Sequence, residues 1–192
     1  MTLPFCVRID ADDTRSAEQL KLDGWREGDD TLETYMRPHD LNGHLTRDPP
    51  PGACAKPEEV DVCIAIANDA FSPKDKTAWV REAFERNDRH VFVKREGGEV
   101  VGFIITRVDP GIMVVDLIAS KYPRRGIGGY LIDAALWQTP YWRTKSGTTM
   151  PHTQVRAGTS SANSVARQFY TGLGFAPLHT RRTFFKEQNC SA

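Results

Sequence analysis

Arg124-Arg125-Gly126-Ile127-Gly128-Gly129 is the stretch of the sequence that decides the fold. It follows a β-rich run at 112–119 and leads into an apolar helical pattern that ends near Trp137, so it is a strand-to-helix turn. Its glycines let the backbone bend tightly, and the helix N-terminus behind them offers unpaired N–H donors and a partial positive charge. With two arginines beside them, these donors predict a diphosphate-binding turn. A plain turn without a ligand is the alternative.

The turn differs from two common nucleotide-binding motifs. It is not a P-loop, because no Gly-Lys-Ser/Thr follows the glycines. It is not the dinucleotide fingerprint GxGxxG either, because Leu131 stands where the third glycine would be.

A second informative segment runs from Asn163 to Phe175. Asn163 and Tyr170 are two helical turns apart, so the pattern places them on one face of a helix. Gly172 and Gly174 are suited to ending that helix. Taken alone, Tyr170 is more often a core aromatic with one satisfied hydroxyl than a catalyst.

The changes of hydrophobic period predict the remaining elements. From residue 58 onward the order is α-α-β-β-β-α-β-α-β, which indicates an α+β (or α/β) fold in which helices flank a central mixed sheet. No internal repeat is apparent. The predicted strands are 3–9, 31–37, 91–94, 100–106, 112–119, 152–157 and 178–186, and the predicted helices are 14–22, 58–71, 75–86, 127–137 and 162–172.

The chain divides into three parts at this level. Residues 1–57 form a small N-terminal αβ portion with a proline-rich linker at 38–57, residues 58–186 form the main domain, and 187–192 are a tail. Residues 139–150 read as a polar loop.

Composition excludes several classes of protein. The 192 residues are 40% hydrophobic and 26% charged, which is ordinary for a soluble globular protein. The apolar runs are too short to span a bilayer, and the N-terminus has no signal-peptide pattern, so we expect a cytoplasmic protein. The four cysteines and five histidines are scattered, so we expect no metal site and reduced thiols.

The net charge of zero hides an uneven distribution. Residues 121–186 hold 10 basic side chains and one acid, whereas residues 1–56 hold 7 and 11, and residues 57–120 hold 8 and 12. A basic third predicts an anionic partner there. The alternative is that acidic and basic side chains simply pair across the fold.

Together, the strand 114–119, the RRGIGG turn and the later N-x-x-A-x-x-x-Y-x-x-L-G-F block resemble the GNAT superfamily of acetyl-CoA-dependent N-acetyltransferases. The resemblance covers residues 58–186 and departs from the family pattern at Pro123, where Arg or Gln is common. It implies that acetyl-CoA binds through three groups of residues and that Tyr170 is the general acid for the departing thiolate. The implied acetyl-CoA ligands are the pantetheine-binding strand Leu117, Ile118 and Ala119, the diphosphate-binding turn Arg124, Arg125, Gly126, Ile127, Gly128 and Gly129, and Asn163 for the pantetheine arm.

The general base is open at this stage. Asp116 could remove the amine proton through water, but a carboxylate bonded to loop amides or to arginine is at least as good a reading. His152 is a weaker candidate. An acceptor amine, such as that of an amino sugar, needs no strong base if it binds in its neutral form.

A closer likeness concerns the acceptor. Residues 116–119 and 155–163 are similar to those of the dTDP-fucosamine acetyltransferases, which acetylate the amino group of a dTDP-4-amino-4,6-dideoxyhexose. Such an acceptor needs a second anion site. Its hypothetical suppliers are Arg143, Lys145, Arg156, Arg181 and Arg182.

Two alternatives stay open. One is a GNAT enzyme that acetylates a protein N-terminus or another small-molecule amine. The other, from a different class, is a nucleic-acid-binding module, which lacks support because the basic residues are not clustered on one helix and no helix-turn-helix or zinc finger is present. We therefore expect no nucleic-acid or membrane partner, while the family's habit of pairing sheets allows a homodimer.

Overall fold

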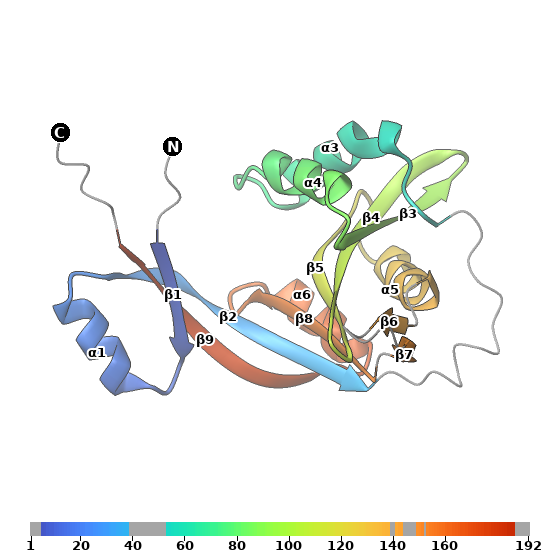
Figure 1. Cartoon of the computed structure of the whole chain (residues 1–192). Helices are drawn as coiled ribbons and strands as arrows, with labels where there is room; N and C mark the ends of the chain where they lie inside the picture. The colour runs from blue at the N-terminus through green and yellow to red at the C-terminus, as the bar shows by residue number, and fades with distance from the viewer. Residues whose placement is uncertain (1–4, 39–52, 139–140, 144–148, 152, 187–192) are drawn as a thin grey trace. The chain divides into compact units, whose positions relative to one another are not determined.

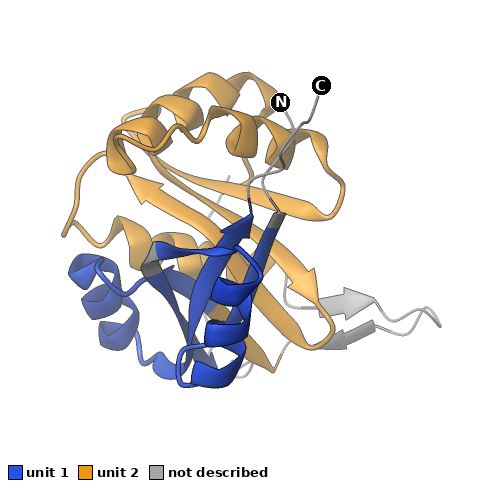
Figure 2. Cartoon of the chain, turned by 90° about the vertical axis from the view of Figure 1, so that its left-hand side faces the viewer, with its two compact units in different colours: residues 1–37, 157–192 blue, residues 38–156 orange. Residues whose placement is uncertain are grey.

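The computed structural model describes residues 5–38, 53–138, 141–143, 149–151 and 153–186 (Figure 1). They form an α+β architecture in which helices flank a mixed sheet, as the sequence predicts. The chain forms two compact units, one made of residues 1–37 and 157–192 and the other of residues 38–156 (Figure 2). This division into compact units does not test the predicted boundary after residue 57, which stays a prediction.

The second unit is built on an antiparallel sheet of β3 (Arg89–Glu96), β4 (Glu99–Asp109) and β5 (Ile112–Ser120), with β4 in the middle. Two hairpins connect these strands. The first turns at Gly97 and Gly98, and the second at Gly111; all three glycines have positive φ, as tight turns require.

Helices cover both faces of this sheet. On one face lie η1 (Pro57–Glu59), α3 (Val60–Ala70) and α4 (Thr77–Glu85), and the apolar sides of α3 and α4 join the core. The buried members of that core are Cys63, Ile66, Ala67, Val80, Ala83, Val93, Val100, Phe103, Ile105, Leu117 and Ala119.

Helix α5 (Ile127–Gln138) packs on the opposite face. Gly102 marks the contact, because a Cβ there would come within 2.6 Å of the Ile127 side chain and 3.0 Å of the Ala119 carbonyl oxygen. The absence of a side chain at Gly102 therefore lets the first turn of α5 lie directly on β4.

The first unit contains β1 (Phe5–Asp10), α1 (Thr14–Leu22), β2 (Arg26–Pro38), the end of β8 (Gln154–Ser160), α6 (Ser164–Gly172) and β9 (Ala176–Lys186). Its strands lie in the order β1-β9-β2-β8. Each β-α-β segment thus has one strand of the other segment inserted between its own two strands.

These two segments form an internal repeat that sequence reasoning missed. We call β1-α1-β2 (residues 5–37) the first repeat and β8-α6-β9 from residue 157 to 186 the second repeat. Asp13 caps α1 by accepting from the Ser16 N–H at 3.0 Å, and Asn163 caps α6 by accepting from the Ala166 N–H at 3.0 Å. Two residues beyond the end of each helix stands a glycine with φ near +80°, Gly24 after α1 and Gly174 after α6.

Pairing between the repeats is symmetric as well. Leu32 of β2 pairs with Arg181 of β9, which is its counterpart in the other repeat. On either side of this pair, Thr31 pairs with Arg182 and Glu33 with Thr180, and each of these two pairs is the counterpart of the other. Each repeat also ends with a cation above the aromatic residue that follows the glycine of the other. These pairs are Arg37 over Phe175, at 5.1 Å, and Lys186 over Trp25, at 5.7 Å.

Other differences from the predicted elements are local. The segment expected to be a polar loop contains two short paired strands, β6 (Tyr141–Arg143) and β7 (Thr149–Pro151). Strand β2 begins at Arg26, five residues earlier than expected, and contains a bulge between Glu27 and Thr31. Most of the proline-rich linker lies outside the described residues.

None of the helices described is long and apolar enough to cross a membrane.

Candidate active site

The RRGIGG turn joins β5 to α5, as predicted. Gly126 has φ +74° and its carbonyl accepts the Tyr130 N–H at 3.1 Å, so α5 begins directly after the turn. Arg124 has φ +64°, a left-handed conformation that costs a residue with a side chain about 1 kcal/mol. Strained residues of this kind persist where function needs them.

Most cations near the turn pair with acids. Lys121 binds Glu99, and Arg125 lies 3.7 Å from Glu96 and over the Tyr122 ring at 5.4 Å. Arg124 is exposed and, among the arginines of residues 121–186 whose side chains the structure describes, it is the one that pairs with no carboxylate; the Arg143 side chain is not among those described. It is therefore the side chain best placed to bind an anion at this turn.

Lys94 is a further cation near this helix that sequence reasoning missed. Its ammonium lies 4.0 Å from the centre of the Tyr130 ring, in the first turn of α5. The two residues are far apart in the sequence, and only the packing of α5 on the sheet brings them together. No local pattern around Lys94 could have shown this.

Strand β5 carries a bulge in its middle. Ile105 pairs with Leu117 and Thr106 with Val115, so Asp116 is an extra residue on β5. A bulge disrupts the regular ladder and re-aims the backbone beside it. Leu117, Ile118 and Ala119, the predicted pantetheine-binding residues, follow this bulge directly and lead to the glycine turn.

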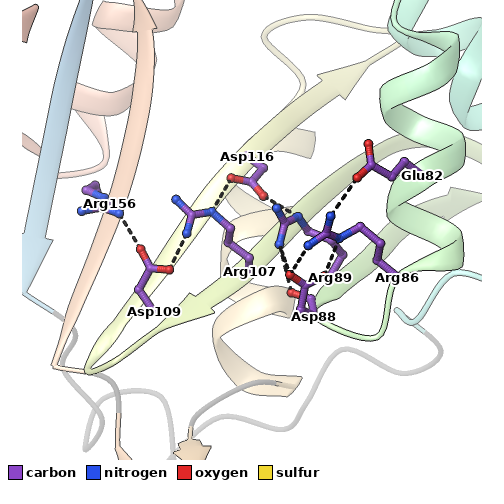
Figure 3. Close-up of polar contacts among 8 residues, drawn as sticks. All are labelled: Glu82, Arg86, Asp88, Arg89, Arg107, Asp109, Asp116 and Arg156. Carbon is purple, nitrogen blue, oxygen red and sulfur yellow. Dashed lines mark hydrogen bonds and ion pairs between the residues drawn. The ribbon is translucent and has the colours of Figure 1, made fainter. Parts of the chain in front are cut away.

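The Asp116 carboxylate is held by two arginines (Figure 3). Arg107 Nε donates to one oxygen at 3.0 Å, and Arg89 Nε lies 3.0 Å from the other. This second contact is close but poorly aligned, because that oxygen is buried and has no hydrogen bond of good geometry. The structure thus favours the arginine-bonded reading of Asp116 over the base.

These ion pairs extend into a network of eight residues. Figure 3 shows the alternating charges, which run from β8 across β4, β5 and β3 to the end of α4. The members, in order of contact, are Arg156, Asp109, Arg107, Asp116, Arg89, Asp88, Arg86 and Glu82. The network satisfies its own charges, and His152, the other candidate base, lies outside the described residues.

Asn163 and Tyr170 belong to α6 in the first unit. The Asn163 side-chain oxygen caps the helix, which leaves its exposed NH2 group as a donor. Tyr170 is only 4% exposed. Its ring packs against the rings of Tyr35, Phe169 and Phe175, with ring centroids 5.2–5.9 Å apart. Burial raises the pKa of Tyr170 well above its usual value of 10, so its hydroxyl is protonated at neutral pH.

The basic third of the chain is largely neutralised by the acidic first 120 residues. Besides the pairs at the glycine turn, Arg156 binds Asp109 at 2.6 Å, Arg167 binds Glu33 at 2.9 Å, and two arginines of β9 bind carboxylates of the first repeat. Pairing across the fold therefore explains most of the charge asymmetry. Three of the supposed phosphate ligands, Arg156, Arg181 and Arg182, are engaged in these pairs, and Lys145 lies outside the described residues.

The described cysteines form no disulfide. Cys6, Cys54 and Cys63 are unpaired thiols, and burial raises the pKa of Cys63 to about 12. No group of three His, Cys, Asp or Glu side chains suited to a metal occurs within the described residues.

Residues 87–177, which include β5, the glycine turn and the Asn163–Tyr170 helix, match the family model described as acetyltransferase (GNAT) domain. These residues are similar to a GNAT acetyltransferase domain. This fold implies transfer of an acetyl group from acetyl-CoA. No curated protein matches the sequence.

Solved structures share the GNAT fold at low identity. A GNAT-family acetyltransferase from Novosphingobium aromaticivorans has 16% identity and a TM-score of 0.60 over 86% of this chain and 69% of its own. A GCN5-related N-acetyltransferase from Sphaerobacter thermophilus has 15% identity and a TM-score of 0.60 over 96% of this chain and 60% of its own. The ribosomal-protein-S18-alanine N-acetyltransferase from Escherichia coli has 14% identity and a TM-score of 0.52 over 73% of this chain and 96% of its own.

Proposed function

We propose that the protein transfers the acetyl group of acetyl-CoA to the amino group of a dTDP-linked amino-deoxysugar, in the cytoplasm and by direct transfer within a ternary complex. The observation that carries the acetyl-transfer chemistry is Tyr170, a protonated and buried tyrosine on the helix that Asn163 caps. The sugar rests on the likeness at residues 116–119 and 155–163.

The reaction needs one proton donor and one set of oxyanion donors. The neutral amine attacks the thioester carbonyl carbon, and a C–N bond forms while backbone N–H groups after the β5 bulge stabilise the oxyanion. The C–S bond then breaks, and Tyr170 gives its hydroxyl proton to the leaving thiolate. The excess proton of the amine passes to water, because Asp116 is already bound by arginines. Water returns a proton to the Tyr170 phenolate, so the enzyme is regenerated and no net proton is released.

Two groups of residues would hold acetyl-CoA. The backbone of Leu117, Ile118 and Ala119 would pair with the pantetheine arm as an added strand does, with the Asn163 amide as a further donor. The N–H groups of residues 125–129 and the Arg124 guanidinium would bind the diphosphate.

A substitution at Arg124 tests the phosphate site without confusing binding with folding. Arg124→Gly removes the guanidinium but relieves the positive φ, so we expect the variant to be more stable by about 0.5–1 kcal/mol. We expect the same variant to bind acetyl-CoA about 10-fold more weakly, measured by titration calorimetry. Unchanged affinity would remove Arg124 from the site.

The acceptor is tested with a panel of amines. Purified protein is incubated with acetyl-CoA and dTDP-amino sugars, peptides with free N-termini, or simple polyamines, and released thiol is followed. Turnover restricted to the dTDP-sugars is the expected result. Turnover of peptides or polyamines alone would replace the sugar with the alternative acceptor class.

A protein N-terminus is the second candidate acceptor. The Escherichia coli enzyme that shares the fold is named for an alanine of ribosomal protein S18. In addition, Arg156, Arg181 and Arg182, three of the residues suggested for binding a sugar nucleotide, already pair with carboxylates, so a neutral acceptor fits them as well as an anionic one.

A further inference from the structure

The first repeat has no counterpart of the predicted catalytic residues. Leu20 corresponds to Tyr170, and Asp13 corresponds to Asn163. The repeat therefore offers no second proton donor. What it does offer is β2, the strand inserted between β8 and β9, which lies against the helix that carries Tyr170.

Strand β2 contacts α6 through three alternate residues. Glu33 binds the Arg167 guanidinium at 2.9 Å, and Tyr35 stacks on Tyr170 with ring centres 5.9 Å apart and planes at 28°. Arg37 Nη1 donates to the carbonyl of Leu173, the C-cap of α6, at 2.8 Å. Each of the last two turns of the helix is thus tied to β2.

Tyr35 is the centre of this contact. It is 3% exposed, and its hydroxyl donates to Glu33 at 2.5 Å and accepts from Arg167 Nε at 3.3 Å. These two bonds fix the ring from its polar end, and the face of the ring lies on Tyr170. A ring held at both its edge and its face leaves its neighbour few alternative rotamers.

We propose that the first repeat serves the second as a positioning element, and that Tyr35 is the positioning residue that orients the Tyr170 hydroxyl and shields it from water. The proposal rests on the proposed role of Tyr170 as general acid. It assigns to Tyr35 a function in catalysis through its contact with Tyr170.

The symmetric position supplies a matched control. Phe184 of β9 corresponds to Tyr35 and is fully buried, but the residue that corresponds to Tyr170 on its side is Leu20. Phe184→Leu and Tyr35→Leu therefore remove comparable aromatic rings from equivalent places. Only Tyr35→Leu removes one from beside the acid.

The test compares Tyr35→Leu, Tyr35→Phe and Phe184→Leu in the full chain. We expect Tyr35→Leu to lower kcat 10- to 100-fold with the KM for acetyl-CoA changed less than 3-fold, and Tyr35→Phe to restore at least a third of wild-type kcat because it keeps the ring. Phe184→Leu should keep kcat within 3-fold of wild type. Unchanged kcat in Tyr35→Leu, or equal losses in it and in Phe184→Leu, would overturn the proposal.

A second readout does not depend on activity. Tyrosinate absorbance near 295 nm, taken as the difference between each protein and the same protein with Tyr170→Phe, follows the ionisation of Tyr170 alone. In Tyr35→Leu this ionisation should begin at lower pH than in the wild type, because water reaches the hydroxyl. An unshifted titration contradicts the shielding role, whereas a shifted titration with an active Tyr170→Phe enzyme refutes only the proposed general acid.

Discussion

The two repeats of the first unit share a backbone arrangement but carry different side chains at corresponding positions. Each is a strand, a capped helix, a left-handed glycine and a returning strand, and each places a cation over the aromatic residue of the other. The side chains at corresponding positions differ. Glu33 and Tyr35 of β2 contact Arg167 and Tyr170 of α6, whereas the corresponding residues of the other repeat are Arg182, Phe184, Ala17 and Leu20, of which only Arg182 is polar.

The comparison indicates that two copies of one backbone can take different roles: the second repeat carries the proposed site, and the first repeat packs against it. The interdigitated strands make each repeat necessary for the sheet of the other, since β1 and β2 have β9 between them and β8 and β9 have β2 between them. Packing requires both repeats to keep the caps and glycines. The proposed reaction requires only one of them to keep the tyrosine.

The strongest test of this comparison is the tyrosine itself. Tyr170→Phe should lower kcat by about 10²–10⁴-fold, because general acid catalysis contributes that much, while acetyl-CoA binding stays intact. Stopped-flow or steady-state thiol release measures the loss. Leu20→Ala is the control in the first repeat, and it should leave kcat within a few-fold; equal turnover in Tyr170→Phe and wild type would end the assignment.

Exchanging the cap residues separates helix capping from ligand binding. Asn and Asp cap helices equally well, so Asn163→Asp should change the free energy of unfolding by less than about 0.5 kcal/mol. It loses the NH2 donor and adds a charge, so we expect the KM for acetyl-CoA to rise about 10-fold. The reverse change, Asp13→Asn, should leave both kcat and KM unchanged, and an equal rise in KM for both variants would contradict the asymmetry.

Sequence reasoning succeeded where the signal is local. The strands at 91–94, 100–106 and 112–119, the glycine turn at 124–129 and the helix that ends before Gly174 were all predicted, because each depends on a few neighbouring residues. The resemblance to the GNAT superfamily rested on the segments around this turn and this helix.

Features that depend on distant pairing were missed. The repeat was overlooked because its halves share a cap, a glycine and an aromatic residue at fixed spacing but little else. The bulge at Asp116 exists only in the register between β4 and β5. The ion pairs that neutralise the basic third join residues as far apart as Glu33 and Arg167, which no local pattern reveals.

The paired cations provide a test of stability. Arg37 combines the contact with Phe175 and a hydrogen bond to Leu173, so Arg37→Ala should cost about 2 kcal/mol of unfolding free energy. Lys186 is exposed and has the ring contact to Trp25, so Lys186→Ala should cost about 0.5 kcal/mol. Urea unfolding measures both, and a larger loss for Lys186→Ala would mean that the first repeat, not the second, limits stability.

The smallest expected effect is a difference in acid sensitivity between the two caps. Hydrogen bonds from Ser16 lower the pKa of Asp13 below its usual 3.8, so the stability from this cap is present above that pH and is lost as the pH falls through the lower folded value. Asn163 does not titrate. The urea midpoint of wild type relative to Asp13→Asn should therefore fall between pH 5 and pH 2.5, and Asn163→Asp should bring the same acid sensitivity to the second repeat. A pH-independent difference for both variants would mean that neither carboxylate caps its helix in solution.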